Sequence, residues 1–202
     1  MDKPALRISN IVTGRRTNGS RVSYLLAPDG SGHQRATPET VVLRRWRQRK
    51  LVGHVFSGTR LSPTIWRAMS FTFPDLHRWV ATPSLEEIEE RIAATLIARK
   101  FQYLSLPSAV TLRALQLDLG LARLRQLIDR HMSDSHRGKS GVPDLYLFAR
   151  TDLSLDAPTF SRFVEVKKPK EPVSKAQKEE IAFMQSLGLQ ARVLRLIERE
   201  VV

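Results

Sequence analysis

Apolar residues recur with helical spacing in the middle of the chain and form short runs after residue 140. From Pro83 to about Arg99 they return every three or four positions, as in an amphipathic helix. A second helical pattern begins at Ser108, a good cap, breaks at Gly120 and continues over residues 121–132. Residues 133–141 are polar and contain glycine, so they predict a loop before the pattern changes.

The remainder of the chain predicts three strands and one helix. Short apolar runs indicate strands over 145–149, 160–167 and 189–197. Between the last two, a helix is expected from its cap Ser174 to about Leu187. The order helix, strand, strand, helix, strand predicts an α/β (α+β) fold, with a mixed sheet flanked by helices.

The first 82 residues are harder to interpret. Residues 22–27 favour a strand, and Thr37-Pro38 is a typical start for a helix that carries residues 41–50. Aromatic and apolar residues between 66 and 79 indicate a local core. We therefore expect two parts: a basic N-terminal extension of unassigned fold, residues 1–82, and a C-terminal domain, residues 83–202.

Charge changes this picture more than composition does. The chain has a net charge of +13, and residues 1–82 contain 14 Lys or Arg against 4 Asp or Glu. Such a surface attracts polyanions, of which nucleic acid is the first candidate. The densest basic run falls in the predicted helix 41–50, and its candidates for phosphate contact are Arg44, Arg45, Arg47, Arg49 and Lys50. A solvated helix face is the alternative for this run.

Other features narrow the setting. Cysteine is absent, which excludes disulfides and thiolate zinc sites. No stretch has the roughly 20 apolar residues needed to span a bilayer, and the first residues lack the apolar core of a signal peptide. We therefore expect a cytoplasmic protein without a membrane partner.

The candidate chemistry lies at the start of one predicted strand and the end of the next. Residues i and i+2 of a strand point to the same face, so Glu165 and Lys167 project together. If the two strands pair, Asp144 lies beside them. Two carboxylates suit a divalent, oxygen-ligated metal, to which the carbonyl of Val166 would add a ligand. Lys167 would then orient an attacking water or stabilise developing negative charge.

Each part of this group also has an ordinary structural interpretation. Pro143-Asp144 is a common turn, and Glu165 and Lys167 could form a solvated ion pair on a strand. Their order and spacing, followed by Ser174 and Gln177, argue against coincidence.

These residues resemble the PD-(D/E)XK nuclease motif, and the longer match resembles its VRR-NUC branch. The match rests on Gly141–Leu145, Phe163–Lys167, Ser174–Gln177 and the closing Leu187-Gly188. It covers about residues 84–197. The resemblance implies a restriction-endonuclease-like fold and a DNA nuclease that depends on Mg²⁺ or Mn²⁺, several members acting on branched or flapped DNA.

The resemblance also implies roles for individual residues. Asp144 and Glu165 would be metal ligands, Lys167 the catalytic lysine, and Gln177 a residue that supports the site or contacts the substrate. Ser174 and Gln177 also form a capping box, so Gln177 could be purely structural. The family further expects a glutamate on the helix that opens the domain. Four residues compete for that role, and Glu89 ranks first by its spacing from Ile92 and Leu96; the others are Glu86, Glu87 and Glu90.

The sequence thus predicts a metal-dependent DNA endonuclease, with branched or flapped DNA as its candidate substrate. Lys168, Lys170 and Lys175 would contact phosphates near the site, or form a solvated edge. Two alternatives stay open: an antibacterial nuclease toxin or defence effector, delivered into a target cell and held by an inhibitor or immunity protein, and a DNA-binding module without catalysis. A homodimer is also left open.

Overall fold

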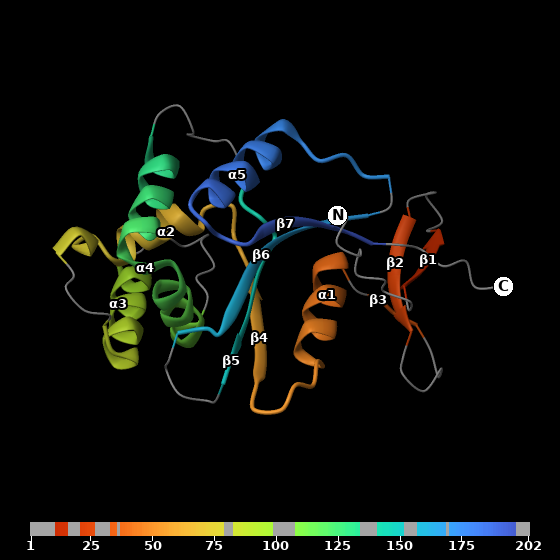
Figure 1. The fold of residues 1–202 in the computed structure, drawn as a ribbon, viewed down its shortest axis with the longest axis horizontal. Coiled ribbons are helices and arrows are strands. Elements are labelled where there is room, and N and C mark those ends of the chain that lie inside the picture. Colours follow the sequence, from red (N-terminus) through yellow and green to blue (C-terminus); the bar gives the residue numbers. More distant parts are fainter. Residues whose placement is uncertain are drawn as a thin grey trace.

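The computed structural model describes residues 11–15, 21–26, 33–35, 37–78, 83–98, 108–133, 141–151, 157–168 and 170–196, with only the backbone for the first three ranges. Its centre is a mixed four-stranded sheet in the order β4-β5-β6-β7 (Figure 1). The strands are β4 (Val55–Arg60), β5 (Leu145–Arg150), β6 (Phe160–Lys167) and β7 (Ala191–Arg195). β4, β5 and β6 pair antiparallel, and β7 pairs parallel to β6.

One face of this sheet is covered by helix α1 (Pro38–Arg47). Thr37 caps the helix and Pro38 occupies its first turn, as their sequence predicts. Val41, Val42 and Trp46 turn inward onto the apolar side chains of β5 and β6. The Trp46 indole N–H donates to the carbonyls of Ser57 (2.8 Å) and Phe148 (3.1 Å), which fixes the ring against the sheet.

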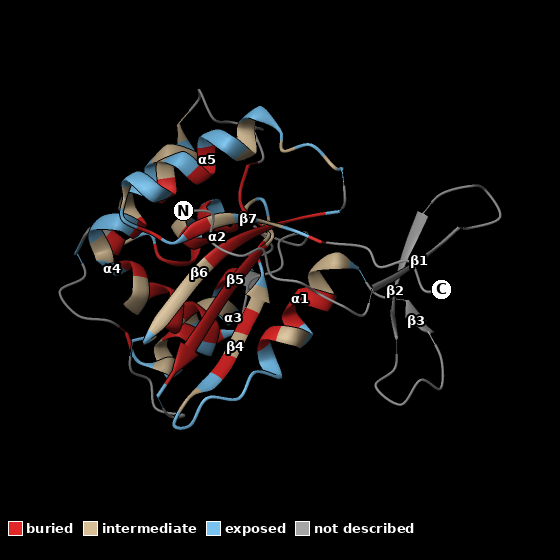
Figure 2. Cartoon of the chain, turned by 45° about the vertical axis from the view of Figure 1, so that its right-hand side comes forward, coloured by how far each residue is buried: buried red, intermediate tan, exposed pale blue. Residues whose placement is uncertain are grey.

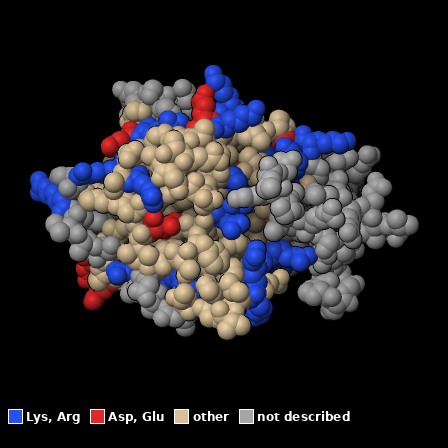
Figure 3. Space-filling model, viewed as in Figure 1, with Lys and Arg blue, Asp and Glu red and all other residues tan. Residues whose placement is uncertain are grey.

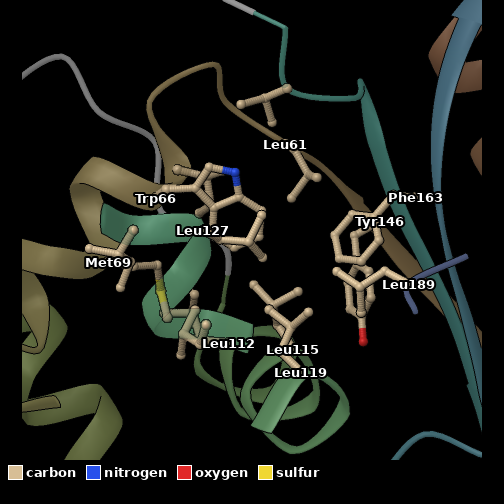
Figure 4. Close-up of a cluster of buried hydrophobic side chains, with 14 of the residues drawn as sticks. Leu61, Trp66, Met69, Leu112, Leu115, Leu119, Leu127, Tyr146, Phe163 and Leu189 are labelled. Carbon is tan, nitrogen blue, oxygen red and sulfur yellow. The ribbon is translucent and has the colours of Figure 1, made fainter. Parts of the chain in front are cut away.

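The other face is covered by the remaining helices. These are α2 (Ile65–Thr72), α3 (Leu85–Ile97), α4 (Ala109–Met132) and α5 (Lys175–Ser186), with a short 3₁₀ turn, η1 (Leu76–Arg78). Tyr146 and Phe163 from the sheet meet Trp66 of α2 and the leucines of α4 in the larger core (Figure 4). β5 lies between the two cores and every one of its residues is buried (Figure 2).

The main sheet draws on both sides of residue 82. β4 was not predicted from the sequence, yet it pairs with β5 along its whole length, from Val55 opposite Arg150 to Arg60 opposite Leu145. Gly58 permits this pairing, because a Cβ there would lie 2.8 Å from the Tyr146 carbonyl oxygen. The boundary expected at residue 82 therefore does not separate the sheet from the segment that precedes it. A second, three-stranded antiparallel sheet is formed by β1 (Ile11–Arg15), β2 (Arg21–Leu26) and β3 (His33–Arg35).

The other predicted elements agree closely with the structure. β6 has the predicted bounds, and α5 differs by one residue at its end. The predicted break at Gly120 is present as a residue with φ of 66°, where two helical segments of α4 meet. The last strand is shorter than predicted, and Trp79 lies outside the described residues. Within the described part of the chain, no helix is both long and apolar enough to cross a membrane.

Candidate active site

The three residues singled out by the motif come together at one end of the sheet. Leu145 pairs with Val164, so Asp144, one residue earlier, stands beside Glu165. Val164 and Val166 point into the core under α1, and Glu165 and Lys167 therefore face the opposite side, as their alternation predicts. One Asp144 carboxylate oxygen accepts a hydrogen bond of 2.7 Å from the amide N–H of Val166, which ties the end of β5 to β6.

Glu165 is buried, with 2% of its surface exposed. Its Oε1 lies 3.0 Å from the Nζ of Lys167 and also accepts a hydrogen bond from the side-chain amide of Gln177. Its other oxygen, Oε2, is buried without a hydrogen-bond partner among the described residues. A buried carboxylate oxygen without a hydrogen bond lowers the stability of the fold, so a ligand that binds this atom would be stabilising.

The carboxyl groups of Asp144 and Glu165 both have raised pKa values. Burial and the nearby Asp144 carboxylate together raise the pKa of Glu165 to about 7, against the lowering effect of Lys167. Burial also raises the pKa of Asp144, which the Val166 N–H partly offsets and the charge of Glu39 reinforces. Both groups would lose their protons more readily beside a cation.

Lys167 lies between two carboxylates. It is buried, and its Nζ is 3.3 Å from an oxygen of Glu171 as well as 3.0 Å from Glu165. Burial disfavours its charge, but the hydrogen bonds and charges of Glu165 and Glu171 together outweigh burial, so the pKa of Lys167 is raised. The ammonium therefore stays charged at neutral pH. No sequence pattern singled out Glu171, which lies in the irregular segment after β6.

The segment after β6 is held over the site by hydrogen bonds. The Lys168 N–H donates to Glu171 (3.0 Å), and Arg195 of β7 donates to the carbonyls of Lys168 (3.0 Å) and Glu171 (2.7 Å). An open pocket of about 820 Å³ lies between this segment, the start of β5, the end of β6 and the first turns of α1 and α5.

Gln177 serves both helix and site. Ser174 and Gln177 form the predicted capping box at the start of α5: the Gln177 N–H donates to the Ser174 hydroxyl, and the Gln177 side-chain oxygen accepts from the Ser174 N–H. The amide nitrogen of the same side chain donates to Glu165. One residue thus satisfies the start of a helix and orients the buried carboxylate, so the two interpretations of Gln177 are compatible.

A different glutamate from the expected one lies in the pocket. Glu89 is exposed on α3, which packs against α2 and α4 on the side of the sheet away from α1, and it is not among the pocket residues. Glu86, Glu87 and Glu90 lie on the same helix and also outside the pocket. Glu39, in the first turn of α1, lines it. α1 lies within residues 1–82, the part of the chain in which the sequence predicted no metal ligand.

The basic residues predicted to contact phosphate divide into groups. Lys168 and Lys170 line the pocket, while Lys175 is exposed at the start of α5, 3.8 Å from Glu179. On and after α1, Arg44, Arg49 and Lys50 are exposed and Arg45 is half-buried. The guanidinium of Arg47 donates to the Gly58 carbonyl (2.7 Å), which directs it to the edge strand.

The residues present suit a hydrated divalent cation. Among the described residues, no three His, Cys, Asp or Glu side chains are grouped closely enough to hold a metal by themselves. Asp144 and Glu165 supply two carboxylates, one with the unpaired oxygen described above. The N–H and C=O of one strand residue point the same way, so the Val166 carbonyl also faces Asp144. Mg²⁺ keeps several waters and needs only one or two carboxylates, which matches this donor set.

Known proteins share features of this sequence and of its fold. The sequence profile of the VRR-NUC domain matches residues 86–196. Among solved structures, paFAN1 bound to DNA with a two-nucleotide 5′ flap and a gap has 16% sequence identity and a TM-score of 0.53. The complex with a one-nucleotide 5′ flap has 15% identity and the same TM-score. Curated protein sequences gave no match.

The fold and the site define a nuclease domain of the PD-(D/E)XK type. The chain belongs to the VRR-NUC family, since the family profile covers more than half of it. The two paFAN1 comparisons cover 83% of this chain but only 36% of the other, so this chain spans about a third of that larger protein.

Proposed function

We propose that this protein is a Mg²⁺-dependent nuclease that hydrolyses phosphodiester bonds in DNA, with Mn²⁺ as a substitute. The observation that carries the proposal is that Asp144, Glu165 and Lys167 line one pocket, with a buried Glu165 oxygen that has no hydrogen-bond partner among the described residues. Family membership and the net charge of +13 support it.

Asp144, Glu165 and the Val166 carbonyl would hold the metal. When bound, the ion would neutralise phosphoryl charge and make a coordinated water more acidic. The protein's own contribution is positioning. Gln177 and the Val166 N–H fix the two carboxylates, while Lys167 places a positive charge at the site, where it can orient a water or stabilise the charge that develops on phosphorus oxygens.

Lys168 and Lys170 would hold the phosphate groups that flank the cleaved bond, because both line the pocket. Glu39 would add negative charge beside the metal-binding residues, since it lines the same pocket and its charge acts on Asp144.

We further propose a branched or flapped DNA substrate. The support is the likeness in fold to paFAN1, which was solved with 5′-flap DNA. The toxin interpretation, with its immunity protein, uses the same chemistry and stays a prediction; so do the homodimer and the cytoplasmic location.

The test is cleavage of labelled linear duplex, 5′ flap, four-way junction and supercoiled plasmid in Mg²⁺, Mn²⁺ or EDTA. E165A and K167A should each lower the cleavage rate at least 10²-fold, on the order of the loss expected for a transition-state stabiliser, while DNA binding in EDTA is retained. Cleavage by either variant at the wild-type rate would overturn the proposal. DNA binding without cleavage of any substrate would favour the non-catalytic alternative.

A further inference from the structure

Three arginines gather on the α1 face of the sheet, away from the catalytic pocket. Arg162 of β6 and Arg192 of β7 are diagonal neighbours on one face, because Phe163 pairs with Ala191 and Val164 with Arg192. Arg49 follows the end of α1 and lies over the same part of the sheet, its guanidinium 5.3 Å from the centre of the Trp46 ring. We call this group the arginine patch.

Aromatic rings hold two of these guanidinium groups in place. Arg162 lies 5.2 Å from the Trp46 ring centre, and Arg49 lies 5.6 Å from the Phe56 ring as well as over Trp46. The Trp46 ring is itself fixed by its two hydrogen bonds to backbone carbonyls. A cation over an indole is attracted by roughly 0.5–2 kcal/mol, and this contact leaves the N–H donors at the guanidinium edge available.

No carboxylate balances the patch in the described part of the chain. Residues of β5, β6 and β7 that face α1 include no Asp or Glu, and no described ion pair involves Arg49, Arg162 or Arg192. The Arg162 Nε is buried without a hydrogen-bond partner. Burial lowers the pKa of Arg162, and the charges of Arg192 and Arg49 lower it further. Three like charges brought together in this way are unfavourable unless an anion joins them.

The patch and the catalytic pocket lie at opposite ends of α1. Thr37 and Glu39, at the start of the helix, line the pocket, whereas Trp46 and Arg49, at its end, belong to the patch. A ten-residue helix is about 15 Å long, which corresponds to roughly four or five base pairs of duplex. In Figure 3, basic side chains gather around α1, and the acidic ones on this view lie elsewhere.

We propose that the arginine patch binds the phosphate backbone of a duplex arm of the DNA, alongside α1 and about half a helical turn from the bond to be cut. This inference rests on the proposed function for the identity of the polyanion. It assigns phosphate contact to two strand residues, Arg162 and Arg192, that the basic run of α1 does not include.

The test measures the affinity of the full chain for a labelled 25-base-pair duplex in EDTA at several salt concentrations. The double variant R162Q/R192Q should bind about tenfold or more weakly at 0.1 M salt. Its plot of log Kd against log salt concentration should be shallower by roughly 2, since each phosphate contact contributes about 0.9. The matched control is R67Q/R125Q, on α2 and α4, which makes the same change in net charge on the opposite side of the sheet.

Equal affinity and slope in the two double variants would overturn the proposal. Because the Arg162 Nε is buried and its guanidinium packs on Trp46, R192Q alone serves if the double variant melts early, and its slope should fall by roughly 1. The two proposals fail separately. If the wild type cleaves DNA and R162Q/R192Q binds duplex as tightly as the wild type, the patch proposal is wrong and the nuclease proposal stands. If R162Q/R192Q loses affinity for duplex but the wild type cleaves no substrate, the nuclease proposal is wrong and the patch proposal stands.

Discussion

At the scale of single residues, Glu165 concentrates the chemistry of this protein. It is a buried carboxylate whose Oε1 contacts Lys167 and Gln177, while its Oε2 has no hydrogen-bond partner among the described residues. Such a group is poorly satisfied without a cation, and its raised pKa expresses the same fact. Burying this carboxylate destabilises the metal-free protein, and a bound cation would remove that penalty.

The raised pKa predicts how stability depends on pH. Between the ordinary glutamate pKa of 4.5 and the folded value of about 7, the folded protein holds a proton that the unfolded chain has lost. This contribution to stability is therefore present below pH 4.5 and disappears as pH rises through about 7. In EDTA, E165Q should become more stable than the wild type by on the order of 1–3 kcal/mol between pH 5 and pH 8.

Thermal unfolding of both proteins across this pH range checks the prediction. Mg²⁺ should raise the melting temperature of the wild type at pH 8 and have little effect on E165Q. A difference between the two proteins that does not change with pH would contradict it.

The choice between two glutamates gives a second prediction. E39Q should weaken Mg²⁺-dependent cleavage by roughly tenfold or more, because Glu39 lines the pocket and its charge acts on Asp144. E89Q, an identical change on the exposed surface of α3, should leave the cleavage rate unaltered. Cleavage rates over a range of Mg²⁺ concentrations would distinguish them, and a loss confined to E89Q would restore the assignment made from the sequence.

At the scale of elements, the start of α5 links folding to the site. Gly141 packs directly against it, since a Cβ there would overlap the Ala176 carbonyl and approach the Glu180 Cβ to 3.1 Å. Glu180 in turn accepts hydrogen bonds from Arg130 (2.9 Å) and His131 (2.7 Å) at the end of α4. These contacts fix α5, and through Gln177 they fix Glu165.

Two substitutions separate the structural and functional roles of Gln177. Q177E keeps a capping-box residue but sets a second carboxylate against Glu165, so we expect cleavage to fall about 10–100-fold with little change in melting temperature. S174A removes the cap hydroxyl and leaves the contact with Glu165; it should cost about 1 kcal/mol of stability and preserve most activity. Melting curves and cleavage rates measured on both proteins test this. Equal activity in Q177E and S174A would mean that Gln177 is only a cap.

At the scale of the whole molecule, the two cores lie on either side of one sheet, so we expect the segments that form them to fold together. The core beneath α1 needs Val41, Val42 and Trp46, and the core beneath α4 needs Trp66 and Met69. All five precede residue 82. The domain that carries the site is therefore larger than the stretch matched by the family profile.

Truncation tests this view of the molecule. A fragment of residues 83–202 loses α1, β4 and α2, which exposes β5 and opens both cores, so it should fail to fold. A fragment of residues 37–202 keeps the main sheet and should unfold cooperatively. Circular dichroism melting compares the two, and a cooperative transition in the shorter fragment would support the boundary at residue 82.

The sequence by itself determined the elements whose cause is local. Alternation of side chains put Glu165 and Lys167 on one face, Ser174 began a helix, and Gly120 interrupted one. It also determined the family, because the motif residues keep fixed spacing along two strands and a helix. These features depend on neighbours within a few positions, which a sequence displays directly.

Only the tertiary structure decided which distant segments complete the site. β4 has weak alternation and a central Gly58, so its strand state comes from pairing with β5, about 90 positions away in the sequence. Glu39 reaches the pocket because α1 packs on the sheet, and Arg162 meets Arg49 because both lie over Trp46. Such contacts follow from how apolar faces are buried together, and nothing in the local pattern of the chain specifies them.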